Sequence, residues 1–506
     1  MKNVLEYLEK TTLKTGNKTA IIEEDKTCSY SELLENSQKV GSEISKYITP
    51  RKPVPILMEK GINGIYAFFG TIYSGGFYVL LNPELPKQRL QKILEVLEAD
   101  IIVTDENNYE LAQEIAENRK ILKIEELKNK EINKEKLQQI RNQALDVDPL
   151  YANFTSGSTG TPKGVLISHK SVIDFIDIFT DKFKINENDI IGNQAPFDFD
   201  VSVKDIYSSI KTGATLLIIP RKLFSMPSKL LDYICENKAT TLIWAVSALC
   251  LITTFHGLDY KVPTTINKIL FSGEVMPIKH LKEWIKHLPE AMYVNLYGPT
   301  EITCNCTYHI INKNTEYEKQ IPAGKSFDNE QVFLLDEKNQ QITKAKEIGE
   351  ICVKGTALAL GYYNDLKQTR EKFIQNPANE KYNDLIYKTG DLGYFDETGD
   401  LYFCGRKDFQ IKHMGHRIEL EEIERAMEKI EKVERACCIY REEKSKIYGF
   451  YIGEITKIEL HDKLKETLPI YMLPNVLTKL EEMPVTKNGK IDRKQLKLFI
   501  TEKGKN

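Results

Sequence analysis

The chain has 506 residues, which is too long for one compact core and predicts two or more domains. Hydrophobic residues make up 41% and charged residues 28%, as in ordinary globular proteins, and a net charge of −3 gives no reason to expect nucleic acid as a partner. The N-terminus lacks the apolar core of a signal peptide, and there is no run of about eighteen apolar residues, so we expect no membrane insertion.

The nine cysteines occur at irregular spacings, which is typical of reduced thiols and predicts a cytoplasmic protein. Cys304 and Cys306 are one residue apart, and Cys437 and Cys438 are adjacent, so each pair can be read as metal ligands. Neither pair has a second pair or histidines at zinc spacing nearby. Buried thiols are the favoured interpretation.

Short β-rich runs alternate with helical patterns over the first ~400 residues, which indicates an α/β fold. Residues 87–99 carry apolar side chains on one helical face. A turn-rich segment at 396–400 predicts a hairpin. The predicted strands are 101–104, 215–219, 240–246, 268–272 and 291–294.

After Gly405 the pattern changes to that of a small α+β unit of about a hundred residues. A helix is predicted from Glu419 to Val433, because apolar residues form one stripe along it. We therefore expect a large N-terminal domain of layered sheets and helices at 1–405 and a small C-terminal domain at 406–506. The lysine-rich tail carries no interleaved aromatic residues, so it predicts a solvated surface and not a nucleic-acid site.

The most informative segment is Thr155–Gly164, which reads TSGSTGTPKG. Glycines let backbone amides turn toward an anion, and the hydroxyls and one lysine add donors. The spacing differs from that of a Walker A loop, in which Gly-Lys-Ser/Thr opens a helix, because here a strand-like GVLIS run follows. A flexible Ser/Gly linker is the alternative, and the apolar flanks on both sides favour a phosphate-binding loop.

This loop resembles the phosphate-binding motif of the adenylate-forming superfamily, which includes acyl-CoA synthetases, luciferases and nonribosomal peptide synthetase adenylation domains. Four further segments match motifs of that family, in the family's order: Asn295–Glu301 (NLYGPTE), Tyr387–Asp391 (YKTGD), Gly405–Lys412 (GRKDFQIK) and Asn488–Lys490 (NGK). The resemblance covers most of the chain. It implies an enzyme that activates a carboxylate with ATP and Mg²⁺ and whose small C-terminal domain is mobile.

In that reaction a carboxylate attacks the α-phosphorus of ATP and pyrophosphate leaves, so the site must neutralise charge and align the groups. By resemblance, Glu301 binds Mg²⁺ and Thr300 hydrogen-bonds the α-phosphate. Asp391 is expected at the ribose hydroxyls; without the resemblance it reads as a turn-capping aspartate. The full set expected at the nucleotide is Thr155, Ser156, Gly157, Ser158, Thr159, Gly160, Thr161 and Lys163 in the phosphate loop, Asn295 and Tyr297 at the adenine, and Gly298, Thr300, Asp391, Arg406 and Lys490.

The C-terminal residues are expected to serve two successive reactions. By resemblance, Lys490 bridges the substrate carboxylate and the α-phosphate during adenylation. The small domain then rotates so that a thiol can attack the acyl-adenylate, and such rotations concentrate in a few residues. Asp408 fits the hinge, and Lys412 and Gly415 fit the face that meets the thiol.

Residues 193–203 (NQAPFDFDVSV) match the segment that begins the substrate pocket in this superfamily. Amino-acid-activating members carry an aspartate there that pairs with the substrate α-ammonium, and Asp200 matches it in register, whereas Asp198 does not. An amino acid is therefore favoured over a simple carboxylic acid, because a buried unpaired carboxylate is costly. By the same resemblance the pocket is lined by Val201, Lys204, Trp244, Leu270, Ser272, Leu296, Cys304 and Asn305.

Two of these pocket residues are unusual. Trp244 is expected to narrow the pocket and favour a small side chain. Lys204 either contacts an acidic or polar substrate side chain or extends its charge to the surface.

Length and the NQAPF-FD-SV-DIY pattern are most similar to the D-alanine:D-alanyl carrier protein ligases, followed by stand-alone peptide synthetase adenylation proteins. The chain ends sixteen residues after Lys490 with no carrier segment, so we expect the phosphopantetheine thiol to come from a separate carrier protein. An acyl- or aryl-CoA synthetase that uses free coenzyme A is the alternative. A nucleotide-binding regulator without chemistry is disfavoured, because Lys490, Glu301 and the loop are intact.

Overall fold

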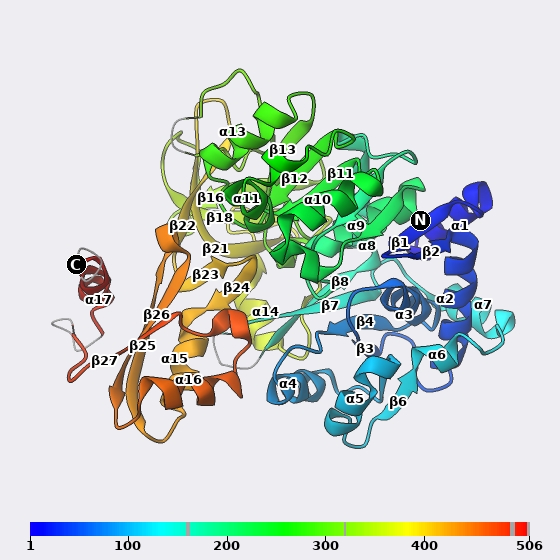
Figure 1. Ribbon diagram of the computed structural model, residues 1–506, viewed down its shortest axis with the longest axis horizontal. Coiled ribbons are helices and arrows are strands. Elements are labelled where there is room, and N and C mark those ends of the chain that lie inside the picture. The colour runs from blue at the N-terminus through cyan, green and yellow to red at the C-terminus, as the bar shows by residue number, and fades with distance from the viewer. Residues whose placement is uncertain (158–161, 318–319, 486–490, 503–506) are drawn as a thin grey trace. The chain divides into compact units, whose positions relative to one another are not determined.

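The computed structural model describes residues 1–157, 162–317, 320–485 and 491–502. The chain divides into two compact units, and Figure 1 colours it by position along the sequence. The first unit contains Met1–Pro83, Leu97–Asn153 and Gly164–Lys407, and the second contains Glu84–Val96, Phe154–Lys163 and Asp408–Asn506. Two segments that are early in the sequence are thus grouped with the C-terminal residues, which the sequence did not predict.

The largest sheet of the first unit has nine strands in the order β15-β14-β13-β12-β11-β9-β10-β1-β2. The strands from β13 to β1 are parallel, and antiparallel strands close both edges. Both faces of the parallel part are covered, which explains its continuous apolar runs. The strands are β1 Thr19–Glu23, β2 Lys26–Ser29, β9 Ile190–Asn193, β10 Thr215–Ile218, β11 Thr241–Ala245, β12 Lys268–Ser272, β13 Met292–Tyr297, β14 Thr307–Ile310 and β15 Lys325–Ser326.

A second sheet has seven strands in the order β19-β8-β7-β4-β3-β5-β6. Its strands from β7 to β6 are parallel, and the predicted phosphate loop joins β7 to β8. The strands are β3 Pro53–Leu57, β4 Phe77–Leu81, β5 Ile101–Thr104, β6 Lys120–Lys123, β7 Pro149–Thr155, β8 Lys163–Ser168 and β19 Gly361–Tyr362.

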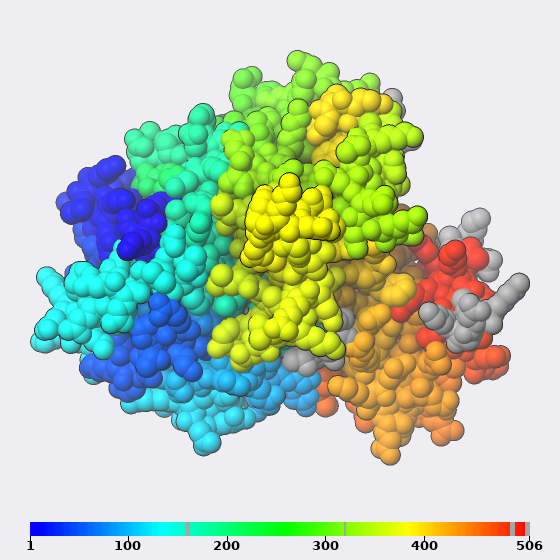
Figure 2. Space-filling view, turned by 180° about the vertical axis from the view of Figure 1, so that it is seen from behind, coloured from blue at the N-terminus to red at the C-terminus, as the bar shows by residue number. Residues whose placement is uncertain are grey.

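A third, six-stranded antiparallel sheet has the order β17-β16-β18-β21-β20, and β22 pairs with β21. Its part of the chain forms a continuous yellow-green to yellow region of the surface in Figure 2. The strands are β16 Glu330–Leu335, β17 Gln341–Ile342, β18 Gly349–Gly355, β20 Phe373–Gln375, β21 Leu385–Phe395 and β22 Leu401–Arg406.

Helices cover both faces of the nine-stranded sheet. On one face α10, α11 and α13 bury a cluster around two tryptophans, and they lie over the green strands in Figure 1. On the other face α8 and α9 pack between the two large sheets in the main core. The first-unit helices are α1 Leu5–Thr15, α2 Tyr30–Ile44, α3 Ile62–Tyr73, α5 Tyr109–Ile115, α6 Ile124–Leu127, α7 Lys134–Gln143, α8 His169–Lys182, α9 Val201–Thr212, α10 Pro227–Glu236, α11 Val246–Thr254, α12 Gly257–Tyr260, α13 Ile278–His287 and α14 Leu366–Lys372, with 3-10 turns η1 Glu106–Asn108, η2 Arg221–Ser225 and η3 Thr300–Ile302.

The second unit has its own apolar core, formed by one face of α15 and α16 against β25–β27. The predicted helix here is confirmed but ends at Glu428, five residues early, because Val433 already begins a strand. Its elements are α4 Lys87–Leu97, β23 Gln410–His413, β24 His416–Glu419, α15 Leu420–Glu428, β25 Val433–Arg441, η4 Glu442–Lys444, β26 Lys446–Gly453, α16 Lys457–Lys465, η5 Ile470–Met472, β27 Val476–Lys479 and α17 Arg493–Glu502.

The other predicted elements are confirmed within one to three residues at each end: the five strands as β5, β10, β11, β12 and β13, and the helix at 87–99 as α4. The predicted hairpin joins β21 to β22, with the Asp396 amide donating to the Asp400 carbonyl at 3.0 Å. The cysteine pairs at 304/306 and 437/438 are buried, as expected. None of the helices in the described ranges is long and apolar enough to cross a membrane.

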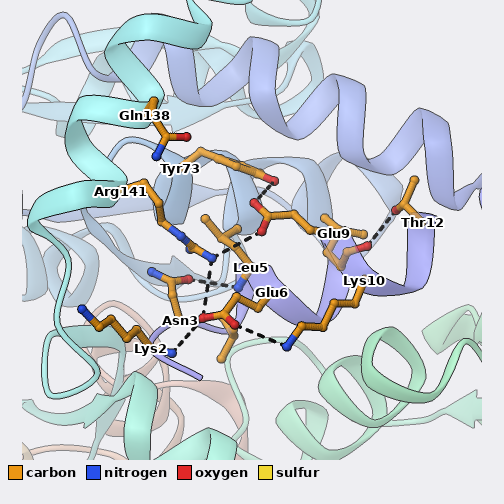
Figure 3. A network of polar contacts seen from close by, with 12 residues as sticks. Lys2, Asn3, Leu5, Glu6, Glu9, Lys10, Thr12, Tyr73, Gln138 and Arg141 are labelled. Atoms are coloured by element: carbon orange, nitrogen blue, oxygen red, sulfur yellow. Dashed lines mark hydrogen bonds and ion pairs between the residues drawn. The ribbon is translucent and has the colours of Figure 1, made fainter. Parts of the chain in front are cut away.

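A polar network fastens α1 to α3 and α7 (Figure 3). Glu9 accepts from the Tyr73 hydroxyl at 3.0 Å and lies 3.4 Å from the Arg141 guanidinium. Glu6, on the same helix, binds Lys10 and the backbone amide of Lys2. A cavity of about 310 Å³ beside this network is lined by none of the predicted site residues.

Gly324 is held where no side chain fits. Its φ is +91°, and an added Cβ would lie 2.0 Å from the Tyr308 carbonyl oxygen. Gly399, in the hairpin, has a similar φ of +80° but open space around it. We predict that Gly324→Ala lowers the free energy of unfolding by about 2–4 kcal/mol, whereas Gly399→Ala costs about 1 kcal/mol for its backbone alone. Urea denaturation of both variants checks this, and equal losses would contradict it.

Candidate active site

One turn, residues 297–306, joins the predicted nucleotide residues to the predicted substrate residues. It leaves the end of β13, passes through η3 and returns as β14. Thr303 and Cys304 both have left-handed backbones, with φ of 54° and 77°, which is uncommon for residues other than glycine. The Cys306 amide donates to the Tyr297 carbonyl at 2.8 Å and closes the turn.

Gly298 makes this closure possible. A Cβ at this position would lie 2.5 Å from the Asn305 Cα and 2.8 Å from the Cys304 carbonyl oxygen. These are backbone atoms, which cannot move aside without shifting the returning half of the turn. Gly298 is one of the residues predicted to bind the nucleotide, and in the structure it lets the two halves of the turn touch.

Glu301 lies inside this turn and is fully buried. Its Oε1 accepts a hydrogen bond from the Tyr362 hydroxyl at 2.8 Å. Thr300 precedes it and is half-buried, and the Thr303 hydroxyl donates to the Ala357 carbonyl at 2.7 Å. A buried carboxylate supported by a phenol offers the hard oxygen that Mg²⁺ prefers, so the side chains here fit the expected metal.

Asp391 is buried, and both its oxygens are engaged. The Tyr297 hydroxyl donates to Oδ2 at 2.5 Å, and Arg406 forms an ion pair with Oδ1. Adjacent strands bring these residues together, since Asp391 on β21 pairs in register with Arg406 on β22. Burial first, and then the nearby Asp391 carboxylate, raise the pKa of Tyr297 well above its ordinary value, so its hydroxyl stays a donor.

The remaining nucleotide residues are only partly accounted for. The Asn295 side-chain amide, predicted to read the adenine edge, donates to the Pro322 carbonyl at 2.8 Å. In the second unit, the Ser156 hydroxyl donates to the Arg417 carbonyl at 2.7 Å, and the Thr155 hydroxyl is buried without a hydrogen bond to any described residue. Gly157 and Lys163 are also buried. Ser158, Thr159, Gly160, Thr161 and Lys490 lie outside the described residues.

The predicted hinge residue Asp408 is exposed and is the first residue of the C-terminal segment of the second unit. Its Oδ1 accepts from the Gln410 amide at 3.2 Å. Hinge motion stays a prediction for this residue.

Asp200, the predicted ammonium ligand, is half-buried at the N-terminus of α9. The Cys304 thiol donates to its carbonyl oxygen at 3.0 Å, which ties α9 to the turn at 297–306. One helical turn later, Lys204 is fully buried, and its Nζ donates to Asn305 Oδ1 at 2.6 Å and to Ser272 Oγ at 3.4 Å. Four of the residues predicted to line the pocket therefore meet beside Asp200. They are Lys204 on α9, Ser272 at the end of β12, and Cys304 and Asn305 in the turn.

Trp244 does not join them, and the prediction that it narrows this pocket is wrong. Its ring is fully buried in the cluster on the opposite face of the sheet, with its Nε1 donating to the Gly192 carbonyl at 2.7 Å. Strand residues alternate between faces, so its neighbour Ile243 takes the face that Leu270 shares. Leu270 and Leu296 belong to the core on the Asp200 side, and Val201 is half-buried at the start of α9.

Two residues were missed by the sequence analysis. Tyr362 supports Glu301 and follows a glycine in a segment that carried no motif. Tyr151 is the third residue of β7, the strand that leads into the predicted phosphate loop, and its buried hydroxyl has no hydrogen-bond partner among the described residues. Burial raises the pKa of this phenol well above its ordinary value, with the neighbouring Cys304 and Asp200 adding to the shift. Its position four residues before the predicted phosphate loop was the only available signal.

Comparison with known proteins places the chain in a family. The sequence profile of the AMP-binding enzymes matches residues 8–363, and the chain belongs to this family. Zwittermicin A synthase ZmaJ of Bacillus cereus is 32% identical over 513 residues, which cover 99% of this chain and 95% of that protein. The family match covers more than half of the chain, and the similarity to ZmaJ extends over nearly the whole length of both proteins.

Other relatives are longer. Tyrocidine synthase 1 of Brevibacillus parabrevis is 30% identical over 503 residues, which cover 98% of this chain but only 45% of that protein. Among solved structures, holo-PA1221, a nonribosomal peptide synthetase protein with adenylation and PCP domains bound to a vinylsulfonamide inhibitor, superimposes with a TM-score of 0.84. That match is 22% identical, covers 98% of this chain and 84% of the other, and establishes the shared fold.

The close fit at Gly298 gives a test of the turn. We predict that Gly298→Ala lowers the free energy of unfolding by about 2 kcal/mol and weakens adenylate formation strongly, because the Cys304–Cys306 backbone must move. Gly64→Ala on α3 is the control, since its nearest neighbour would be 3.5 Å away and alanine favours a helix. Denaturation and pyrophosphate exchange measure both effects. Full activity of Gly298→Ala would show that the turn adapts.

Proposed function

We propose that the protein activates an amino acid as its aminoacyl-adenylate and transfers it to the phosphopantetheine thiol of a separate carrier protein. ATP and Mg²⁺ are the proposed cofactors. The observation that carries the amino acid assignment is Asp200, which stands at the start of α9 and is tied by Cys304 to the turn that bears Glu301. The proposal that a carrier protein accepts the amino acid is supported by holo-PA1221, in which an adenylation domain of the same fold is joined to a PCP domain.

The proposed chemistry assigns one task to each group. Asp200 pairs with the substrate α-ammonium and so fixes the carboxylate that attacks the α-phosphorus. Glu301 holds Mg²⁺, which supplies charge neutralisation when bound. Asp391 and Arg406 position the ribose, the phosphate loop binds the β- and γ-phosphates, and Lys490 bridges the two reacting anions. The sequence motifs and the family membership support these roles.

Asp200→Ala should weaken the use of amino acids and leave ATP affinity nearly unchanged. Loss of the partner of a buried ammonium is expected to cost about 2–5 kcal/mol, which appears as a large fall in kcat/KM for the amino acid. Pyrophosphate exchange with paired amino acids and their des-amino analogues measures it. Normal activation of amino acids, with no gain for the analogues, would remove Asp200 from this role.

Lys490→Ala should abolish most adenylation but leave thioester formation from a preformed aminoacyl-adenylate largely intact. The proposed reason is that this ammonium stabilises charge only in the first transition state. The two half-reactions are measured on the same preparation, with Lys487→Ala as a control three residues away. Equal loss in both half-reactions would contradict the role. Transfer to free coenzyme A at the rate seen with carrier proteins would favour a CoA synthetase.

A further inference from the structure

Lys204 is a fully buried lysine beside the proposed ammonium ligand. Its Nζ donates to two neutral oxygens, Asn305 Oδ1 at 2.6 Å and Ser272 Oγ at 3.4 Å. It therefore does not extend to the surface, which settles one of the two alternatives left open by the sequence. A lysine is seldom buried without a charged partner, because desolvation of an ammonium is expensive.

The nearby carboxylates do not neutralise this ammonium by direct contact. Among the described residues, Lys204 has no carboxylate oxygen within the 4.0 Å of an ion pair. Asp205 is turned toward Asn193, whose amide donates to its Oδ2 at 2.7 Å. Asp200 is the ligand proposed for the substrate α-ammonium. Burial accordingly lowers the pKa of Lys204, although Cys304 and the two aspartates act in the opposite direction.

The same place offers further donors. An ammonium has three N–H groups, and Lys204 uses two of them. The Asn305 side chain accepts from Lys204 through its oxygen, and none of the hydrogen bonds formed by the described residues uses its Nδ2. The Ser272 hydroxyl accepts from Lys204 and keeps its own hydrogen to donate. Three donors of one small cluster thus lack acceptors, while Leu270 and Leu296 lie in the apolar core on this side of the sheet.

We propose that this cluster binds the side-chain carboxylate of an acidic amino acid, so that the substrate belongs to the aspartate and glutamate class. The inference rests on the proposed function, in which Asp200 takes the α-ammonium. Each substrate charge then meets one protein charge: the ammonium meets Asp200 and the side-chain carboxylate meets Lys204. Alanine, the substrate suggested by the similarity to D-alanine ligases, would leave Lys204 without an anion.

The test is pyrophosphate exchange over a panel that varies two features separately. One feature is the α-amino group: aspartate is compared with succinate, and glutamate with glutarate, which lack that group. The other feature is the side-chain carboxylate: aspartate and glutamate are compared with asparagine, glutamine, alanine and leucine. Each amino acid is tested as its L and its D form. We expect kcat/KM for an acidic amino acid to exceed that for alanine by about a hundredfold or more, because a site built to bind a polar group rejects an analogue without it.

Substitutions test whether Lys204 causes this preference for an acidic amino acid. Lys204→Met should lower kcat/KM for the acidic amino acid by about a hundredfold and shift preference toward apolar amino acids. Ser208→Ala, one turn further along α9 and also buried, is the matched control and should not change the preference. If Lys204→Met does not fold, Asn305→Leu, which leaves the charge in place, should reduce the same preference. Thermal unfolding with and without ATP verifies that each variant is intact.

The outcomes separate the two proposals. Preference for alanine, leucine or an amide side chain in the wild-type enzyme overturns the acidic class but leaves amino acid activation standing. Succinate or glutarate used as well as the amino acids overturns amino acid activation, whereas sensitivity to Lys204→Met would still support carboxylate binding at this cluster. An acidic preference that persists in Lys204→Met overturns the inference.

Discussion

The turn at 297–306 is the constraint on which the rest of the site depends. Its two halves touch at Gly298, and two non-glycine residues, Thr303 and Cys304, adopt left-handed backbones to complete it. Such conformations cost free energy and persist only where surrounding contacts enforce them. Here those contacts reach in both directions: Glu301 is held by Tyr362, and Cys304 is held by Asp200. The turn therefore carries one residue of the predicted nucleotide side and one residue of the predicted substrate side on a single closed piece of backbone.

The alternation of side chains along β11 and β12 sets what the substrate side of the sheet contains. Ile243 pairs with Leu270 on that face, whereas Trp244 pairs with Phe271 on the other. Because the period is two, a shift of one residue exchanges one face for the other. The large indole thus belongs to the helix-covered core around α10 and α11, and the polar end of β12, Ser272, is left to face Lys204.

The predictions from sequence succeeded or failed according to the kind of signal that each residue carries. Motifs whose chemistry depends on residue type, such as Asp391 with Arg406, were identified from sequence and lie together in the structure. The prediction that Trp244 lines the pocket was wrong by one position along the strand. Where both faces of a strand are apolar, composition does not show which residues lie on which face. Tyr362 and Tyr151 were missed, since single tyrosines carry no spacing pattern. The early segments grouped with the C-terminal unit were also invisible, because contacts between distant parts of a chain leave no local signal.

The buried charged residues around the start of α9 do not stabilise the fold, so their presence needs another explanation. Burial raises the pKa of Asp205 to about 7 and lowers that of Lys60 to about 7, and Asn193 hydrogen-bonds both side chains. Shifts in these directions mean that each group is less easily ionised in the folded protein than in water. With Lys204, these groups oppose folding unless something else compensates, and apolar residues of the same size would often be more stable. Lys204 and Asp205 lie on the helix that Asp200 begins, and Lys60 reaches the same place through Asn193. This concentration of charge suits a site that recognises charged groups on its substrate.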